Sequence, residues 1–134
     1  MNYWLVKSEP STFSWERFVK EKKAVWDGVR SYPGRKNLRE MKKGDQVLFY
    51  HSMEGLAVVG IAEVSKEGYQ DPTTQDDWTA VDLKPVKAFK RPVTLVEIKA
   101  EKKLQDIYLV KQARLSVSPL EKKEFDLVVK MGGL

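Results

Sequence analysis

The chain contains no cysteine and only one histidine among its 134 residues. The lack of cysteine excludes disulfide bridges, thiol nucleophiles, cysteine-ligated zinc and iron–sulfur clusters. A single histidine also excludes metal sites built from several imidazoles. The apolar runs fall well short of the roughly 20 residues that cross a bilayer, and the first residues lack the layout of a signal peptide. We therefore expect a cytoplasmic protein with no membrane partner.

Patterns that indicate catalysis are also scarce. His51 is the natural general base, but Ser52 follows it on an expected strand and would point to the opposite face, so the two do not form a dyad. Asp71, Asp76 and Asp77 could chelate magnesium, although acids in a loop with proline and threonine are typical of a solvated turn. No phosphate-binding glycine pattern or nucleophile elbow is present. The residues favour a non-catalytic binder without a metal or cofactor.

Positive charge and aromatic residues gather in the first part of the chain. The net charge is +5, and residues 1–50 hold 11 Lys and Arg against 6 Asp and Glu, together with 9 of the 14 aromatic residues. Cations that meet phosphates and rings that stack on bases are typical of a nucleic-acid surface. The alternative is a basic, soluble protein whose tryptophans fill the core.

The hydrophobic pattern predicts an α+β fold, in which short peripheral helices surround a small, mostly antiparallel curved sheet or barrel. We expect strands at 2–7, 24–26, 46–52, 56–65, 80–89 and 114–117. Helices are expected at 14–22 and 34–41, after a capping box at Thr94-x-x-Glu97, and after another at Ser118-Pro-Leu-Glu121. Residues 66–79 read as an irregular acidic loop. The length suits a single domain over 1–134, which we expect to be monomeric.

The segment 25–39 carries the most functional information. It combines two aromatic rings with basic residues and an amide: Trp26, Tyr32, Arg30, Arg35, Lys36, Arg39 and Asn37. Such a segment can stack on a base, contact phosphates and read a base edge. The alternative is a core tryptophan beside a solvated basic surface. Because Asp27-Gly28 favours a turn directly after Trp26, we expect the ring at the end of a strand, which favours a binding site.

Ordered motifs along nearly the whole chain resemble the EVE domain, including its stand-alone bacterial members. These motifs are Trp4-Leu-Val-Lys-Ser-Glu-Pro10, Phe13-Ser-Trp15, Val25-Trp-Asp-Gly-Val-Arg30, Gly44-Asp45, Phe49-Tyr-His-Ser52, Val59-Gly-Ile-Ala-Glu-Val64, Asp71-Pro-Thr73, Val81-Asp82, Pro92-Val-Thr-Leu95, Glu97-Ile-Lys99 and Arg114-Leu-Ser-Val117. The resemblance implies a PUA-like fold, a small β-barrel surrounded by helices. This agrees with the strand-rich pattern of the chain.

The same resemblance implies recognition of a modified base in DNA or RNA, since the EVE domain is related to YTH domains, which enclose methylated adenine in an aromatic cage. Together, the residues and the resemblance assign base binding to Lys7, Ser8, Trp26, Arg30, Tyr32, Asn37, His51, Ser52 and Trp78. Phosphate contacts are assigned to Arg35, Lys36 and Arg39. Ser31-Tyr-Pro-Gly-Arg-Lys-Asn37 departs from the usual Asn-Tyr-Gln-Ala-Arg-Asn of the family, so the base preference is open to change.

Two other functions stay open from the sequence. One is an enzyme that acts on a nucleotide or modified nucleoside through His51. The other is an adaptor for a small ligand or a protein, whose binding would lack the steep salt dependence that phosphate contacts impose.

Overall fold

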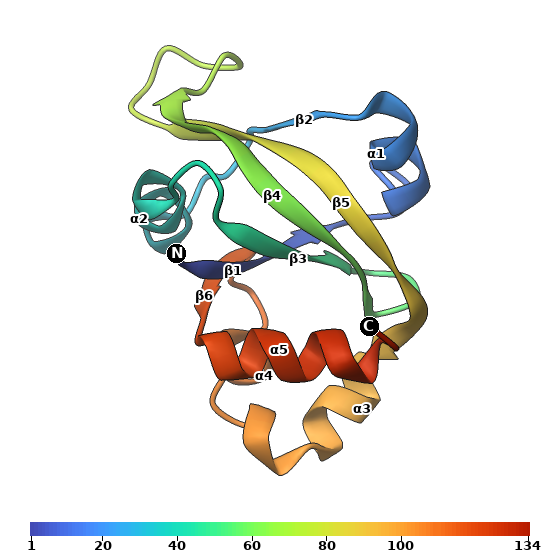
Figure 1. Cartoon of the computed structure of the whole chain (residues 1–134). Coiled ribbons are helices and arrows are strands. Elements are labelled where there is room, and N and C mark those ends of the chain that lie inside the picture. Colours follow the sequence, from blue (N-terminus) through green and yellow to red (C-terminus); the bar gives the residue numbers. More distant parts are fainter.

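The computed structural model describes all 134 residues and contains one six-stranded sheet in the order β2-β5-β4-β3-β1-β6 (Figure 1). The strands are β1 (Tyr3–Ser8), β2 (Ala24–Trp26), β3 (Gln46–His51), β4 (Ala57–Gln70), β5 (Thr79–Thr94) and β6 (Val117–Leu120). Neighbouring strands pair antiparallel, except β1 and β3, which are parallel. The expected α+β class with a mostly antiparallel sheet is confirmed.

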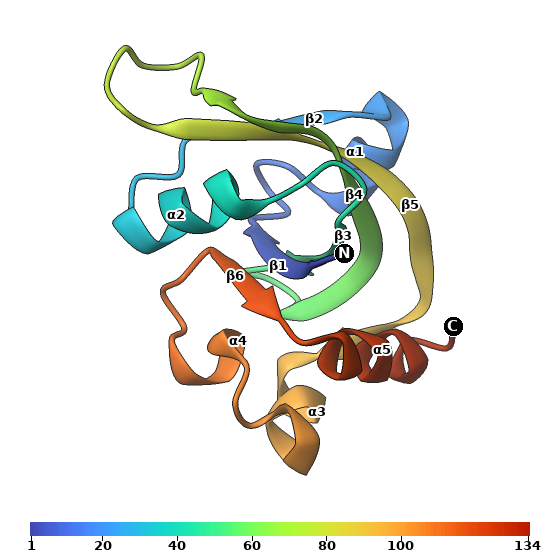
Figure 2. The same cartoon turned by 60° about the vertical axis from the view of Figure 1, so that its left-hand side comes forward.

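The sheet curls strongly on itself (Figure 2). The pairing of the two longest strands, β4 and β5, shifts register at four places along its length. Such irregularities bend a strand and increase its twist, which is how a sheet of this size curves like a barrel. The edge strands β2 and β6 do not pair with each other. Helix α2 (Tyr32–Glu40) packs against β4, β5 and β6 and covers this opening.

The remaining helices lie around the sheet. They are α1 (Trp15–Glu21), α3 (Leu95–Ala100), the 3-10 turn η1 (Lys102–Leu104), α4 (Tyr108–Lys111) and α5 (Lys122–Met131). Helices α3, α4 and α5 gather at one end of the molecule, whereas α1 and α2 flank the other (Figures 1 and 2). None of the helices combines the length and the apolar character that crossing a bilayer requires.

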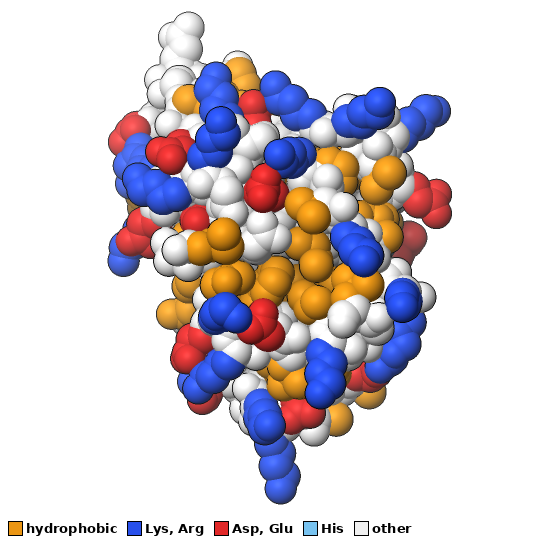
Figure 3. Space-filling model, viewed as in Figure 1, with side chains coloured by type: hydrophobic (Ala, Val, Ile, Leu, Met, Phe, Trp, Pro, Cys, Tyr) orange, Lys and Arg blue, Asp and Glu red, His pale blue; other side chains and the backbone are white.

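The central strands are buried on both faces. Side chains alternate across a strand, so Val47 and Phe49 of β3 join a core inside the curl, while Leu48 and Tyr50 join a second core beneath α3 to α5. Some apolar side chains still reach the surface where α5 lies beside the strands (Figure 3). The two cores separate the molecule into a helical end and an end that carries β2, α1 and α2.

The expectation of an irregular loop over 66–79 is wrong for its first part. Strand β4 continues to Gln70, which pairs with Thr79 at the start of β5. Residues 66–70 of β4 and the start of β5 thus form an extended two-stranded arm. Lys66 and Glu67 are exposed in this arm, and it contains few apolar side chains. Backbone pairing with β5, rather than burial of side chains, holds this part of β4 in place. Its sequence therefore lacks the alternation of apolar and polar residues that indicates a strand.

The expected helix start at Ser118 is also wrong. Ser118 lies in β6, which replaces the strand expected at 114–117, and helix α5 begins later, with a capping box between Glu121 and Glu124. Pro119 is tolerated because β6 is an edge strand and needs fewer backbone donors. The capping box at Thr94 is confirmed, and Ser14 caps the start of the helix expected at 14–22.

Candidate functional site

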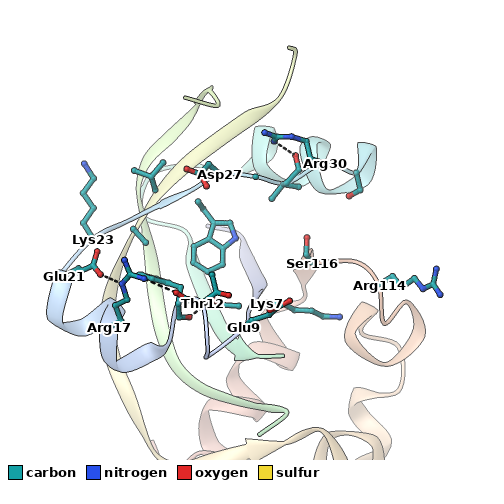
Figure 4. A pocket seen from close by; sticks show the side chains of 18 residues that line it. Lys7, Glu9, Thr12, Arg17, Glu21, Lys23, Asp27, Arg30, Arg114 and Ser116 are labelled. Carbon is teal, nitrogen blue, oxygen red and sulfur yellow. Dashed lines mark hydrogen bonds and ion pairs between the residues drawn. The ribbon is translucent and has the colours of Figure 1, made fainter. Parts of the chain in front are cut away.

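A groove of about 1120 Å³ lies beside β2 and the end of β1 (Figure 4). Its walls come from the end of β1 and the turn after it, one side of α1, the strand β2 with the loop after it, and the segment before β6. These segments are far apart in the sequence. The lining contains more polar and charged residues than apolar ones, as expected of a site for a polar ligand.

Trp26 is the aromatic wall of this groove. Strand β2 ends at Trp26, as the following Asp27-Gly28 predicts, and its ring is half-buried. Phe13 and Phe49 meet the ring nearly at right angles, at 74° and 79°, with centroids 6.4 and 5.7 Å away. These rings fix the indole by edge contacts, and no aromatic side chain stacks on its face. Such a ring can stack on a flat ligand.

The buried Asp71 fixes the loop that follows Trp26. Its Oδ2 accepts hydrogen bonds from the Gly28 N–H and from Arg30 Nη1, both at 2.9 Å, and Oδ1 accepts one from the Thr73 N–H at 2.7 Å. Burial raises the pKa of Asp71, but the bonds from Thr73, Arg30 and Gly28 outweigh it and hold that pKa well below its usual range. Asp71 therefore anchors the loop as a carboxylate.

Lys7 and Ser8 bring polar groups to the opposite wall from the end of β1. Ser8 Oγ donates a hydrogen bond to the Phe13 carbonyl at 2.6 Å, which closes the turn and leaves the hydroxyl oxygen able to accept another. Lys7 Nζ donates to the Ala113 carbonyl, and burial lowers the pKa of Lys7. The Lys7 N–H also donates to the Ser116 carbonyl, so the segment before β6 is tied to this wall.

Basic side chains outnumber acidic ones around the groove: Lys7, Arg17, Lys23, Arg30 and Arg114 against Glu9, Glu21 and Asp27. Several of the cations are already paired, Arg17 with Glu21, Lys23 with Asp82 and Arg30 with Asp71. The Arg114 side chain makes no hydrogen bond or ion pair and extends outward (Figure 4). Arg114 is therefore the lining arginine that is free to meet an anionic ligand.

Comparison with known protein families shows that residues 2–131 match the EVE domain. The chain belongs to the EVE domain family. Mouse thymocyte nuclear protein 1 is 34% identical over 165 residues, which cover 97% of this EVE domain and 73% of the mouse protein. Among solved structures, a protein from Agrobacterium tumefaciens has a TM-score of 0.96 and 46% identity, covering 100% of this chain and 94% of that one.

Two further structures bear on the site of this EVE domain. The human THYN1 protein, crystallised in complex with DNA containing 5-methylcytosine, has a TM-score of 0.89 and 31% identity, covering 100% of this chain and 99% of that one. The YTH domain of a Zygosaccharomyces rouxii protein has a TM-score of 0.60 at 17% identity, which shows a shared fold. The expected relation to EVE and YTH structures is confirmed.

The EVE domain brings only part of the predicted base site together. Lys7, Ser8, Trp26 and Arg30 line the groove, whereas the other predicted residues lie outside it, namely Tyr32, Asn37, His51, Ser52 and Trp78. Buried Asn37 donates from Nδ2 to the Val117 carbonyl at 2.7 Å and so ties α2 to β6. That amide is occupied within the protein.

His51 and Ser52 support the groove from behind it. His51 Nε2 accepts a hydrogen bond from the Trp15 N–H at 3.0 Å, in the first turn of α1. Burial lowers the pKa of His51 against a smaller opposite effect of Glu16, so the neutral ring that accepts this bond is favoured. The Ser52 N–H donates to the Ser8 carbonyl at 2.9 Å. Both residues therefore hold the turn and the helix that form the wall.

Tyr32 and Trp78 stack on each other outside the groove, with ring centroids 5.7 Å apart and planes at 23°. Of the predicted phosphate contacts, Arg35 and Arg39 both pair with Asp77, and exposed Lys36 has no ion-pair partner. All three lie on α2, Arg35 contacts both rings of the aromatic pair, and none of the three lines the groove.

Sequence reasoning missed the anchoring role of Asp71 and the groove positions of Phe13 and Arg114. The motif Asp71-Pro-Thr73 was the available signal, because aspartate before a turn accepts backbone N–H bonds two residues on. Arg114 carried no such signal, since its position depends on pairing between β1 and the distant segment around β6. No group of three His, Cys, Asp or Glu side chains is placed to hold a metal ion.

Proposed function

We propose that this EVE domain binds nucleic acid by taking one modified base of DNA or RNA into the groove beside Trp26. The observation that carries this proposal is the complex of the human THYN1 protein with DNA containing 5-methylcytosine, whose fold matches this entire chain at a TM-score of 0.89. The indole of Trp26, on whose face no other aromatic ring stacks, and the unpaired Arg114 support it. We also propose that residues 1–134 form a single EVE domain, since the family match spans 2–131.

The energetics of such binding rest mainly on stacking. Removing a base from its stack costs a few kcal/mol, and least where the strand is already single. Stacking on Trp26 returns about 1–3 kcal/mol. A methyl group buried in the groove adds about 0.8 kcal/mol, so the preference for a methylated base over the plain base is expected to be about fourfold.

Polar groups around the ring suit the rest of a nucleotide. The Ser8 hydroxyl oxygen and the Asp27 carboxylate can accept hydrogen bonds from an exocyclic amino group, as acidic side chains do from cytosine. Burial raises the pKa of Asp27, and the neighbouring charge of Asp71 acts in the same direction. Arg114 places an unpaired cation at the rim for an adjoining phosphate.

We infer that the groove binds without catalysing a reaction. The single histidine lies outside the groove, and its Nε2 is engaged by the Trp15 N–H. Ser8 donates its hydroxyl proton to a backbone carbonyl, and none of the lining hydroxyls is hydrogen-bonded to a histidine or carboxylate that could act as its general base. Incubating the protein with modified nucleosides and nucleotides should therefore yield no product, and turnover that His51→Ala abolishes would contradict the inference.

The binding proposal is tested by fluorescence anisotropy with single-stranded oligonucleotides that differ by one base modification, 5-methylcytosine in DNA and N6-methyladenine in RNA. We expect Trp26→Ala to weaken binding about tenfold, because it removes the stacking surface, and Trp26→Phe to retain most of the affinity. Val96→Ala, an exposed position on α3, is the matched control and should bind like the wild type. Equal affinity of Trp26→Ala and the wild type would refute the groove as the binding site.

A further inference from the structure

One ring of the aromatic pair outside the groove is largely exposed, and the other is half-buried. Tyr32, the first residue of α2, exposes 70% of its surface, yet it stacks on Trp78 from the loop between β4 and β5. Neither ring belongs to the two cores. Two flat side chains from distant segments therefore form a small platform that faces the solvent, which we call the Tyr32–Trp78 platform.

Arginine side chains hold the platform in place. The Arg35 guanidinium lies 4.9 Å from the Tyr32 ring centroid and 5.2 Å from that of Trp78, and Arg35 Nη1 donates to the Asp77 carbonyl at 2.9 Å. The Arg30 guanidinium lies 5.7 Å from the Trp78 ring. Because cation–π contacts and a backbone bond fix both rings, little side-chain freedom would be lost when a ligand stacks on them.

The platform is continuous with the groove. Arg30 and Ser31 line the groove, and Tyr32 is the next residue along the chain. Arg30 contacts both sites, since its guanidinium bonds Asp71 Oδ2 and Thr73 Oγ1 behind the groove and also lies over Trp78. A ligand that leaves the groove past Arg30 therefore meets the Tyr32–Trp78 platform next.

The charges beside the platform suit a phosphate. Arg35 and Arg39 share Asp77, whose side chain is 77% exposed, so these ion pairs are worth little and a phosphate could replace the carboxylate. Lys36 is exposed next to them and has no ion-pair partner. A flat ring beside several cations is the chemistry that binds an unpaired nucleotide.

We propose that the Tyr32–Trp78 platform is a second stacking site, which binds the unpaired base next along the strand from the base held beside Trp26. This inference rests on the proposed function, because the strand must enter the groove for its neighbour to reach the platform. The platform adds affinity for single strands without reading a modification, since every base offers a flat face for stacking.

The test compares three probes by titration: 5-methyldeoxycytidine monophosphate, a single-stranded DNA heptamer with one central 5-methylcytosine, and that heptamer with abasic residues flanking the 5-methylcytosine. We expect Tyr32→Ala to bind the intact heptamer at least about fivefold more weakly than the wild type does. Binding of the monophosphate and of the abasic heptamer should be unchanged, and Tyr32→Phe should restore the affinity. An unchanged thermal midpoint confirms that Tyr32→Ala is folded, as its exposure implies.

The outcomes separate the two proposals. Equal affinity of Tyr32→Ala and the wild type for the intact heptamer would overturn the platform, as would an equal loss for the intact and abasic heptamers. If Trp26→Ala binds every probe like the wild type, the groove proposal falls, and the platform as the site of the neighbouring base falls with it. If Trp26→Ala loses affinity for every probe while Tyr32→Ala binds each like the wild type, the groove stands and the platform alone falls. If the wild type binds no probe, both proposals fall.

Discussion

A carboxylate taken fully out of water needs hydrogen-bond donors on both oxygens. Asp71 finds them in Gly28, Arg30 and Thr73, so one buried side chain joins the loop after β2 to the arm of β4 and β5. Gly28 adopts a φ of +76°, a conformation that suits glycine, which brings its N–H to the carboxylate. The position of Arg30 between the groove and the Tyr32–Trp78 platform follows from this single anchor.

We predict that Asp71→Asn lowers the free energy of unfolding by about 3 kcal/mol, because it puts an amide donor in place of a buried carboxylate oxygen and leaves N–H donors of Gly28, Arg30 or Thr73 without their acceptor. The folded pKa of Asp71 lies below its unfolded value of about 3.8, so its contribution is complete above that pH and is lost as the pH falls below it. Urea denaturation between pH 7 and pH 3 should show that the variant loses less free energy of unfolding on acidification than the wild type does. Parallel pH profiles for variant and wild type would contradict the assignment.

Individual site residues were predictable from sequence only where a local signal settled their surroundings. Trp26 was placed at a strand end by the turn residues after it, and the structure agrees. Asn37 could not be placed, because its amide is occupied by the Val117 carbonyl, 80 residues away in the sequence. Whether a polar side chain is free for a ligand depends on such distant partners.

At the scale of elements, α1 lies close against the sheet because β4 carries a glycine beneath it. A Cβ added at Gly60 would come within 2.5 Å of the Trp15 ring, which is buried and also meets Phe49 and Phe18 edge-on. The close approach of helix and strand therefore depends on the missing side chain. It also sets the position of α1, one side of which forms a wall of the groove.

We predict that Gly60→Ala lowers the free energy of unfolding by about 2 kcal/mol through overpacking against Trp15. Gly68→Ala, at an exposed position of the same strand, should change the free energy of unfolding by less than about 1 kcal/mol, since the nearest atom to its Cβ would be a Thr79 methyl at 3.1 Å and the next ones lie at 3.7 Å. Equilibrium denaturation of Gly60→Ala, Trp15→Leu and the double variant decides the mechanism. If the losses of unfolding free energy in the two single variants add up to the loss in the double variant, a clash between the two positions is excluded.

Element boundaries were predictable where burial or capping chemistry is local. The strand β3 and the capping box at Thr94 follow from short stretches of sequence. The arm of β4 and β5 and the edge strand β6 do not, because backbone pairing with a partner strand holds them. Pro119 therefore indicated the start of a helix where the structure has strand β6. The acidic composition of residues 66–79 indicated a loop where the structure continues β4.

For the molecule as a whole, basic and acidic side chains are interspersed on the face shown in Figure 3. On this face the positive charge is not gathered into a single patch, and the net charge of +5 gives a moderate attraction to polyanions. Near the groove and the platform, however, Arg114 and Lys36 are cations without partners in the protein. They are the side chains best able to replace condensed counterions on a strand.

We predict that affinity for single-stranded oligonucleotides falls linearly with salt on a log–log plot, with a slope of about −0.7 for each phosphate contact. Arg114→Ala and Lys36→Ala should each reduce the slope by about that amount and weaken all sequences equally. Lys102→Ala, an exposed and unpaired cation of η1 at the helical end, should leave it unchanged. Anisotropy titrations from 50 to 200 mM salt measure the slopes, and a slope that neither Arg114→Ala nor Lys36→Ala changes would disprove their contact with phosphate.

The pairing of β1 with β6 has a consequence for how the protein acquires its activity. Tyr3 pairs with Leu120, and the groove wall at Lys7 is completed by residues 113–116. Contacts between such distant segments form slowly, because the entropy cost of closing a long loop comes before the contacts stabilise the chain. A growing chain on the ribosome therefore cannot complete the groove until β6 has emerged, so binding competence arises only with the last steps of folding.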